Sequence, residues 1–378
     1  MADGAPAVPF LDLVSQQAEV ADEVLAAWER LLRAAHFVGG PDVAAFEREF
    51  AAYIGVEHVV GVANGTDALE LAYRALGIQA GDEVILPVNT FIATAEAVTA
   101  VGATPVFVDV DDETLLIDPA AAESAITERT RAIVPVHLFG QTAPVEALAP
   151  LAARRGIAIV EDAAQSQGAV SAAGRAGALG TIAATSFYPG KNLGAAGDAG
   201  AVMTDDAALA DVVRNLGAHG SSVKYVHDRV GRNSRMDAVQ SVALSAKLRR
   251  LDDWNAARAA AADRYADLLA ASPGVRLPGT RSGNRDVWHL YVVRVEERDR
   301  VLADLAAAGV GAAIHYPTPL HLTDAYAGLG YRRGQFPVAE RAAARILSLP
   351  MFPHLTRAQQ ERVASVLTAA TSRSRSHG

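Results

Sequence analysis

The 378-residue sequence contains no cysteine. This absence excludes disulfide bonds, thiolate metal ligands and a cysteine nucleophile. Positive charge is also in short supply, because 34 Lys and Arg residues stand against 43 Asp and Glu residues and give a formal net charge of −9. A chain with this balance is a poor candidate for binding nucleic acid or an anionic membrane, since both rest on clustered positive charge.

Long apolar segments are missing as well. No apolar run reaches the roughly 18 residues needed to span a bilayer, and the first residues lack the basic and then apolar pattern of a secretory signal. We therefore expect a cytoplasmic protein with no membrane partner. The chain does have enough apolar material for a large core, since 51% of its residues are hydrophobic and 20% are charged.

Between about residues 57 and 205, short β-branched runs alternate with Ala/Leu-rich stretches. The pattern predicts strands at 59–63, 83–87, 104–110, 131–137, 157–162, 182–188 and 200–204. It predicts helices at 67–76, 94–101, 119–126, 144–155 and 206–216. Such alternation is typical of βαβ units on a mostly parallel sheet. In these sheets, ligands bind beyond the carboxyl ends of the strands.

The pattern changes after residue 235. It predicts helices at 236–248, 254–271, 299–308 and 357–371, with strands at 288–295 and 311–315. A Gly/Pro/Ser/Arg-rich break separates the second of these helices from the first strand. We expect a large domain over residues 1–250, which includes the N-terminal segment, and a smaller α+β domain over residues 251–378.

The strongest local signal is a lysine in a glycine-rich loop. Lys191 follows a Pro-Gly turn just past the predicted strand at 182–188. Glycine lets the backbone approach a bulky ligand, and a partly desolvated lysine can form a Schiff base. A solvated lysine on a surface turn would have the same local sequence. A Walker A loop is excluded, because Thr185 stands where that motif needs glycine and Asn192 where it needs Ser or Thr.

Two further segments complement this lysine. Asp162 ends an apolar strand, where a carboxylate needs a partner such as a cationic ring nitrogen, although a helix N-cap is the common alternative. The turn at Gly65 and Thr66 begins a helix and suits a phosphate, unless Thr66 or Asp67 merely caps that helix. A lysine, an aspartate and a phosphate turn are the three groups that pyridoxal phosphate (PLP) requires.

In their order and spacing, these motifs resemble one known family. The chain is similar to the DegT/DnrJ/EryC1/StrS sugar aminotransferases, on motifs at 8–13, 37–41, 64–69, 90–94, 134–140, 161–165, 186–200, 233–237 and 315–317. The resemblance implies an α/β fold of the type I PLP-dependent transferases, like aspartate aminotransferase, with a mostly parallel central sheet. It also implies a homodimer whose active sites are shared between subunits.

The resemblance assigns roles by position. It implies that Lys191 forms the Schiff base with PLP and is the catalytic base, that Asp162 pairs with the pyridinium nitrogen, and that Gln165 bonds the ring hydroxyl. Phe91 would lie against the ring. The phosphate contacts would be Gly65, Thr66 and Ser186, with Asn233 reaching the phosphate of the neighbouring subunit's cofactor.

Substrate contacts are implied on the same basis. His315, Tyr316 and His321 lie in a segment that lines the sugar side in relatives, although packing within a loop would also explain them. Lys224 and Tyr225 lie in a stretch that contacts the nucleotide-sugar in relatives. The basic residues that could meet a diphosphate are Lys224, Arg229, Arg232 and Arg235, each of which would as readily be solvated surface charge.

We therefore expect a PLP-dependent aminotransferase, with pyridoxamine phosphate (PMP) as the cofactor's intermediate form. It would move an amino group from L-glutamate to a keto group at C3 or C4 of a nucleotide-linked deoxy sugar. The expected nucleotide is dTDP, and the general resemblance favours C3 over C4. The usual setting is antibiotic or surface-polysaccharide biosynthesis. Two alternatives stay open: an enzyme acting on a cyclitol or non-nucleotide keto sugar, and a non-catalytic regulator that binds PLP. An intact Lys191 and Asp162 argue against the regulator.

Overall fold

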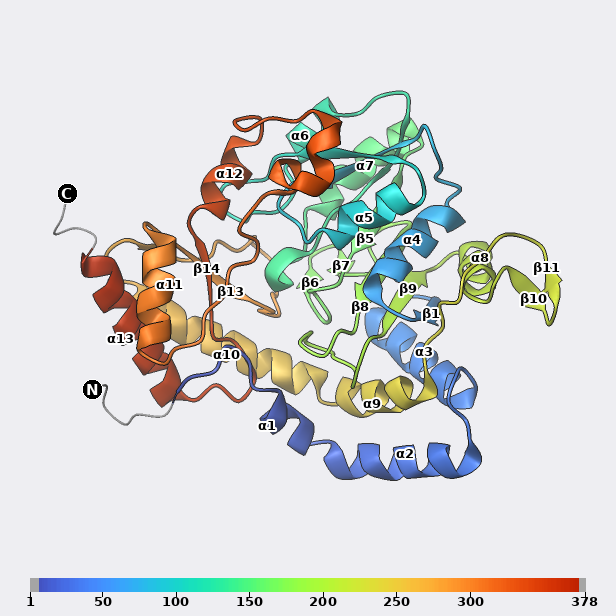
Figure 1. Cartoon of the computed structure of the whole chain (residues 1–378), viewed down its shortest axis with the longest axis horizontal. Coiled ribbons are helices and arrows are strands. Elements are labelled where there is room, and N and C mark those ends of the chain that lie inside the picture. Colours follow the sequence, from blue (N-terminus) through green and yellow to red (C-terminus); the bar gives the residue numbers. More distant parts are fainter. Residues whose placement is uncertain (1–6, 374–378) are drawn as a thin grey trace.

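The computed structural model describes residues 7–373, and a seven-stranded sheet forms its centre (Figure 1). The strands are β1 (His58–Val62), β2 (Glu83–Pro87), β3 (Thr104–Val108), β4 (Thr130–Ile133), β5 (Ala158–Asp162), β8 (Ile182–Ser186) and β9 (Gly200–Thr204). They lie in the order β1-β9-β8-β5-β4-β2-β3, and only β9 runs antiparallel to its neighbours. The predicted mostly parallel α/β sheet is confirmed.

Some predicted strands are too long: those over 104–110 and 182–188 end two residues early, at Val108 and Ser186, the one over 288–295 begins only at Tyr291, and the largest excess is in the strand over 131–137. The sequence pattern predicts a strand over 131–137, whereas β4 ends at Ile133. Pro135 follows two residues later and has no N–H with which to continue a ladder. Beyond it, Val136 makes only an isolated bridge to Asp162. The chain therefore leaves the sheet early, beside the end of β5.

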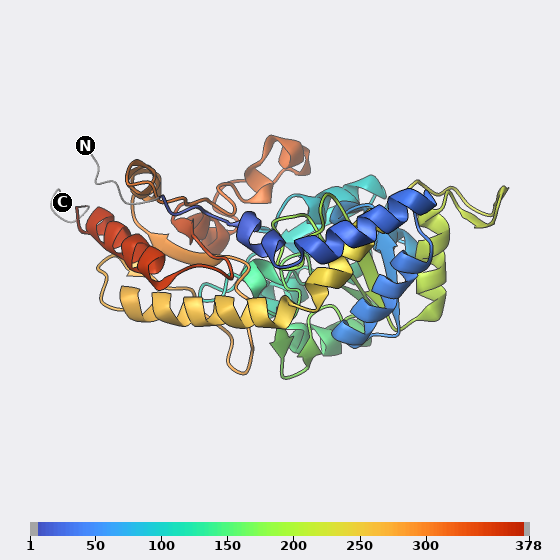
Figure 2. The same ribbon diagram turned by 90° about the horizontal axis from the view of Figure 1, so that it is seen from below.

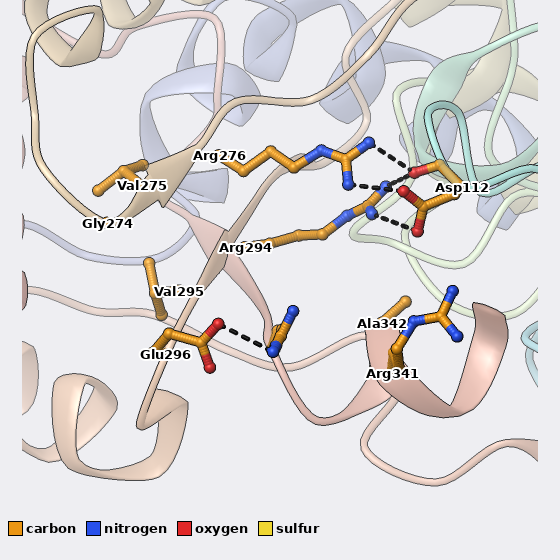
Figure 3. A pocket seen from close by; sticks show the side chains of 10 residues that line it. Asp112, Gly274, Val275, Arg276, Arg294, Val295, Glu296, Arg341 and Ala342 are labelled. Carbon is orange, nitrogen blue, oxygen red and sulfur yellow. Dashed lines mark hydrogen bonds and ion pairs between the residues drawn. The ribbon is translucent and has the colours of Figure 1, made fainter. Parts of the chain in front are cut away.

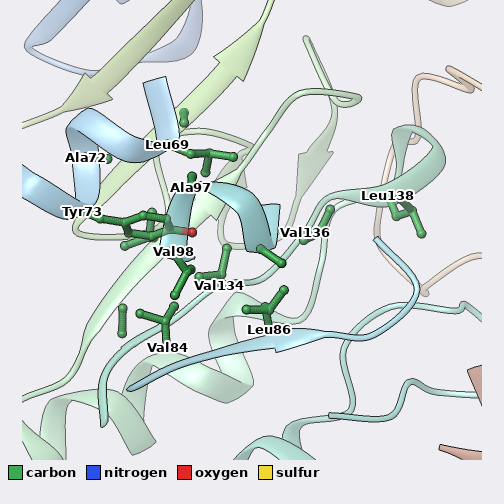
Figure 4. Close-up of a cluster of buried hydrophobic side chains, with 14 of the residues drawn as sticks. Leu69, Ala72, Tyr73, Val84, Leu86, Ala97, Val98, Val134, Val136 and Leu138 are labelled. Carbon is green, nitrogen blue, oxygen red and sulfur yellow. The ribbon is translucent and has the colours of Figure 1, made fainter. Parts of the chain in front are cut away.

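Helices cover both faces of the sheet (Figures 1 and 2). One face carries α4 (Gly65–Ala75), α5 (Ala93–Ala100) and α8 (Ala207–Gly217), and the other carries α3 (Pro41–Ile54), α6 (Pro119–Ser124), α7 (Val145–Arg155) and α9 (Ala238–Leu248). Neighbouring strand residues point to opposite faces. In β2, Val84 and Leu86 pack under α4 and α5 (Figure 4), while Ile85 packs with α6 and α7. This explains why the strands are apolar at almost every position.

Two further helices precede α3 along the outside of the molecule (Figure 2). They are α1 (Leu13–Ala18) and α2 (Ala21–Ala34). One edge of α2 packs on α9, where Trp28 Nε1 donates a hydrogen bond to the Val239 carbonyl at 2.8 Å. Two large apolar side chains of α2, Leu25 and Leu32, are exposed.

A second core lies at the other end of the molecule (Figures 1 and 2). Its antiparallel sheet consists of β12 (Val275–Arg276), β13 (Tyr291–Val295) and β14 (Ile346–Leu349). The helices around it are α10 (Leu251–Leu269), α11 (Arg298–Ala307) and α13 (Arg357–Arg373), whereas α12 (Pro337–Ala343) packs buried alanines in the core of the large sheet. This is the smaller α+β unit expected from the sequence. The predicted strand at 311–315 is wrong, because only Ala313 bridges to Ser348 there.

The division between the two units at residue 250 stays a proposal. In its favour, residues of α10 pack in the second core. The N-terminal segment crosses the same division, because Val8 is buried in the second core and bridges to Val310. Residues 1–6 and 374–378, at the outer ends of the two proposed domains, lie outside the described residues.

Two short hairpins complete the part of the fold that bears on function. β6 (Val170–Ser171) pairs with β7 (Gly174–Arg175), and β10 (Ser221–Val223) pairs with β11 (Val226–His227). The β10–β11 hairpin extends away from the rest of the molecule in both views (Figures 1 and 2). Over residues 7–373, no helix combines the length and the apolar character that crossing a membrane would require, and no cluster of three or more His, Asp or Glu is placed to hold a metal ion.

Candidate active site

A cavity of about 560 Å³ opens at the carboxyl ends of β5 and β8. This is the end of a parallel sheet at which ligands are expected. Residues from both cores line the cavity. It brings together nine of the residues singled out from the sequence: Gly65, Thr66, Phe91, Asp162, Gln165, Ser186, Lys191, His315 and Tyr316.

Lys191 lies in this cavity and not on a solvated surface turn. Its loop follows β8, and the Lys191 N–H donates to the Tyr188 carbonyl at 2.8 Å. Burial lowers the pKa of the Lys191 ammonium to about 8, although the negative charge of Asp162 acts in the opposite direction. A lysine in this state can lose its proton near neutral pH and act as a nucleophile or a base.

The residue after the lysine anchors the loop. Asn192 Nδ2 donates hydrogen bonds to Asn255 Oδ1 at 2.8 Å and to the Val287 carbonyl at 2.9 Å. Asn192 Oδ1 is thus left to accept from His289 Nδ1 at 3.1 Å. Burial is the main cause that lowers the pKa of His289 well below its usual range, and the charge of Lys191 adds to it. His289 is therefore a neutral ring in the cavity wall, with its proton on Nδ1.

Asp162 is held by donors from two directions. Thr94 Oγ1 donates to Asp162 Oδ2 at 2.8 Å, and the Ala164 N–H donates to Oδ1 at 3.2 Å. The Thr94 hydroxyl is itself 2.8 Å from that of Thr90. The next element after β5 is the strand β6 (Val170–Ser171) and not a helix, so the N-cap alternative for Asp162 is wrong. The carboxylate is fixed at the cavity, on the same side as Lys191.

Gln165 connects two walls of the cavity. Its Oε1 accepts from the Phe139 N–H at 2.7 Å, and its Nε2 donates to the Tyr316 hydroxyl at 3.1 Å. The rings of Tyr316 and Phe91 lie with centroids 5.5 Å apart and planes tilted by 39°. Phe91 is 51% exposed, so a flat ligand could still pack against it.

The start of α4 forms a compact cradle with the end of β8. A Cβ on Gly65 would lie 2.6 Å from Ser186 Cβ, so only glycine allows this approach. Asn64 caps the helix by accepting from the Asp67 N–H at 2.8 Å. The alternative that Thr66 or Asp67 provides the cap is therefore wrong, and Thr66 lines the cavity instead. Backbone N–H groups at the start of a helix attract anions such as phosphate.

His315 also lines the cavity. Its Nδ1 is 2.8 Å from Ser348 Oγ, and its ring stacks on Phe10 with centroids 5.7 Å apart. Burial, with a smaller effect of the Lys191 charge, lowers the pKa of His315 to about 4. Like His289, it is a neutral imidazole at physiological pH.

Four predicted site residues lie outside the cavity. His321 is buried against Phe336, and its Nε2 is 3.0 Å from Glu340 Oε1, so packing accounts for its position. Lys224 and Tyr225 lie on the β10–β11 hairpin, where Tyr225 is 82% exposed. Asn233 is exposed and accepts from Arg235 Nε at 3.2 Å.

The basic residues near the hairpin differ in their surroundings. Arg232 forms ion pairs with Asp67 at 3.2 Å and with Glu70, so its charge is neutralised within the chain. Lys224 and Arg229 are exposed. The suggestion that Arg232 meets a diphosphate therefore has no support from its position.

Sequence reasoning missed several residues that hold the site. Thr94 supports Asp162 from α5, His289 approaches from the start of β13, and Tyr188 lines the cavity beside the lysine loop. For Thr94 the sequence did contain a signal, because Thr90 and Thr94 are four residues apart, which is about one helical turn. His289 had none, because its place depends on the packing of the second core against the first.

The fold and the donor set of the cavity define the class of protein. Three groups in the cavity fit PLP: a helix N-terminus for the phosphate, a held carboxylate for the ring nitrogen, and a lysine. The sheet order, with its one antiparallel strand, is that of a type I PLP-dependent transferase. A sequence profile of the DegT/DnrJ/EryC1/StrS aminotransferase family matches residues 18–368. The chain belongs to this family.

Similar sequences include an erythromycin biosynthesis sensory transduction protein, EryC1, of Saccharopolyspora erythraea, which is 50% identical over 96% of this chain and 99% of that protein. A dTDP-3-amino-3,4,6-trideoxy-alpha-D-glucose transaminase of Streptomyces venezuelae is 49% identical over 95% and 94%. A UDP-2-acetamido-2-deoxy-3-oxo-D-glucuronate aminotransferase of Pseudomonas aeruginosa is 42% identical over 96% and 99%.

Solved structures agree with these matches. DesV of S. venezuelae, in complex with a ketimine intermediate, has a TM-score of 0.94 at 48% identity, over 97% of this chain and 98% of that one. NtdA of Bacillus subtilis with bound cofactor PMP has a TM-score of 0.91 at 31% identity, over 98% and 86%. The predicted family, fold class, enzyme class and cofactor are thereby confirmed.

Proposed function

We propose that the protein transfers the amino group of L-glutamate to the C3 keto group of a dTDP-linked deoxy sugar. The observation that carries the proposal is the half-buried Lys191, whose pKa is lowered, beside the held carboxylate of Asp162, in a cavity large enough for a cofactor ring and part of a sugar. The choice of C3 and dTDP is supported by relatives whose names specify a 3-amino or 3-oxo sugar, with dTDP in the more similar of them.

Each residue of the cavity has its own role in the proposed reaction. When bound, PLP supplies an electron sink for a carbanion. Lys191 Nζ would accept a proton from the reacting carbon and return it, since its lowered pKa suits transfer in both directions. Asp162 would face the ring nitrogen. The phosphate would be held by Gly65, Thr66 and Ser186.

The aromatic wall would control access. The rings of Phe91 and Tyr316 pack against each other in the cavity lining, and Gln165 fixes the Tyr316 hydroxyl. Such a wall excludes water from the reacting carbon. Over the full cycle, glutamate leaves as 2-oxoglutarate and the keto sugar leaves as an amino sugar, so the cofactor and Lys191 return to their starting state.

A homodimer with shared sites forms part of the same proposal. Large apolar side chains are exposed beside the cavity and on the turn before α3, namely Phe37, Val38, Phe91 and Tyr188. Exposed apolar patches of this kind mark protein interfaces. In a symmetric dimer, the projecting β10–β11 hairpin and the exposed Asn233 would reach the partner's cavity, which gives Lys224, Tyr225 and Asn233 a role that one chain alone cannot give them.

The test uses purified protein reconstituted with PLP. L-Glutamate should convert the visible absorption of bound PLP to that of PMP, and the PMP form should then aminate a dTDP-linked 3-keto-6-deoxy sugar at C3. Amination of only a UDP-linked sugar, or only of a cyclitol ketone, would overturn the choice of substrate. PLP that binds but does not respond to any amino donor would favour a non-catalytic regulator, a reading to which the name of the EryC1 relative lends weight.

A further inference from the structure

A second cavity, of about 470 Å³, lies where β12 and β13 meet α12 (Figure 3). It shares no residue with the active-site cavity. Strand β13 runs between the two, because His289 and Leu290 line the active site just before it and Val295 at its far end lines the second cavity. Five strand residues place the two roughly 16 Å apart. We call this second cavity the arginine cleft.

The charge of the arginine cleft is opposite to that of the whole protein. Its charged lining residues are Asp112, Arg276, Arg294, Glu296, Arg341 and Arg345. Four guanidinium groups against two carboxylates leave two positive charges in excess. The chain as a whole carries −9, so the local excess does not follow from composition.

Two of the arginines share one carboxylate. Arg276 and Arg294 lie directly opposite each other on the antiparallel strands β12 and β13. Asp112 Oδ2 accepts from Arg276 at 2.7 Å, and Asp112 Oδ1 accepts from Arg294 at 3.2 Å. Only 10% of the Arg294 side chain is exposed. Burial lowers the pKa of Arg294 and the charge of Arg276 lowers it further, while the charges of Asp112 and Asp111 act in the opposite direction.

Of the other two arginines, only Arg341 adds to the positive excess. Arg345 is neutralised by Glu296 at 2.9 Å. Arg341 has no hydrogen bond or ion pair to any residue in the part of the chain that the structure describes, and its guanidinium borders the same cavity (Figure 3). Its charge acts on Asp112 as well, since it helps to lower the pKa of that carboxyl.

We propose that the arginine cleft binds a phosphate-bearing anion with at least two negative charges, such as a free or nucleotide-borne diphosphate. Planar guanidinium groups bind phosphate oxygens through paired hydrogen bonds. Arg341 offers all its donors, and Arg276, half-exposed, can turn part of its fork from Asp112 to a ligand. The bound anion would connect α12 to β12. It would also offset the positive charge of the arginines that Asp112 alone does not balance.

The experiment is a calorimetric titration of the PLP-saturated protein with sodium pyrophosphate at fixed ionic strength. Saturation with PLP keeps the probe out of the cofactor's phosphate cradle. The variant Arg341→Gln should weaken pyrophosphate binding roughly tenfold or more, and Arg276→Gln combined with it should abolish measurable binding. The exposed Arg357 on α13 supplies a matched control, because Arg357→Gln makes the same charge change outside the cleft and should leave the affinity unchanged.

The source of the phosphate is settled by competition. If dTDP binds the cleft more tightly than pyrophosphate does, the ligand is a nucleotide, and if pyrophosphate binds as tightly or more tightly, a small phosphoanion is the ligand. Absence of pyrophosphate binding, or equal binding in wild type and Arg341→Gln, would overturn the proposal. Because Arg341 is exposed and unbonded, this single variant keeps the fold even if the double variant does not. The outcome is independent of the amino-transfer reaction.

Discussion

Asn192 Oδ1 accepts a hydrogen bond from His289 Nδ1 at 3.1 Å. This bond joins the residue beside Lys191 to the segment just before β13. The lysine loop belongs to the large sheet, whereas β13 is the central strand of the second core. The position of the lysine is thus fixed by both halves of the molecule.

Replacement of Asn192 tests this connection. Asn192→Leu removes three hydrogen bonds, two of them buried, and leaves Asn255 Oδ1, the Val287 carbonyl and His289 Nδ1 without this partner. We expect the free energy of unfolding to fall by about 2–5 kcal/mol, measured by urea denaturation of the cofactor-free protein. Asn284→Ala removes a single, more exposed bond to the Thr142 carbonyl and should cost about 1 kcal/mol. Equal losses in the two variants would contradict a special role for Asn192.

The ionisation of Lys191 can be measured directly, because the chain has only three lysines, Lys191, Lys224 and Lys247. In cofactor-free protein labelled at lysine Cε, the NMR signal of Lys191 should titrate with a pKa of about 8, against 10.5 for an ordinary lysine. Lys224→Arg and Lys247→Arg assign the signals. Asp162→Asn should move the Lys191 pKa lower still, because the carboxylate charge raises it. A Lys191 pKa near 10.5 would refute the burial argument.

The same shift has a consequence for stability. Since the unfolded chain holds this proton more tightly than the folded one, protonated Lys191 destabilises the cofactor-free protein at pH values below about 8. The penalty should disappear as the pH rises from 8 toward 10.5. The stability difference between wild type and Lys191→Met should therefore shrink over that interval, and a difference that stays constant with pH would argue against the shift.

The cradle at the start of α4 predicts a steric effect. Gly65→Ala would place a Cβ 2.6 Å from Ser186 Cβ, so we expect a loss of about 1–3 kcal/mol in unfolding free energy and weaker PLP binding. Adding Ser186→Gly should recover the stability, because it removes the clashing atom. Gly328→Ala meets no atom within 4 Å and serves as the control. If the second substitution recovered nothing, the clash would not be the cause.

Shared active sites predict complementation between two inactive variants. In a mixed dimer of Lys191→Ala and Asn233→Ala, one cavity combines both defects and the other has neither. Random mixing after mild unfolding and refolding should restore about a quarter of wild-type activity, since half the dimers are mixed and each has one intact site. An activity equal to the mean of the two parents would show that Asn233 acts within its own chain or not at all.

Much of the site could be predicted from the sequence because its parts are local. Asp162 and Ser186 end apolar strands, Lys191 follows a turn, and Gly65 begins a helix, so the alternation of strands and helices already brings them to one edge of the sheet. His289, Asn192 and Thr94 could not be placed in the same way. Their positions depend on contacts between elements far apart in the chain, which no local pattern encodes.

Similar limits apply to the fold. The helices α1 and α2 lie before the region where strands and helices alternate, and α2 packs on α9 more than 200 residues away. The strand predicted at 131–137 was too long because its apolar pattern continues past Pro135, while the backbone hydrogen bonding does not. Apolar patterning reports burial, and only the missing N–H of proline marks where the ladder ends.

Borohydride trapping is the most direct test of whether Lys191 is the residue that forms the covalent bond with PLP. Reduction of the PLP-loaded protein, followed by proteolysis and mass spectrometry, locates the pyridoxyl group on one of the three lysine-containing peptides. We expect the group on Lys191 alone, and prior treatment with L-glutamate should prevent the labelling. Labelling of Lys247 or Lys224 in its place would refute the assignment of Lys191, as would PLP binding with no covalent bond to the chain.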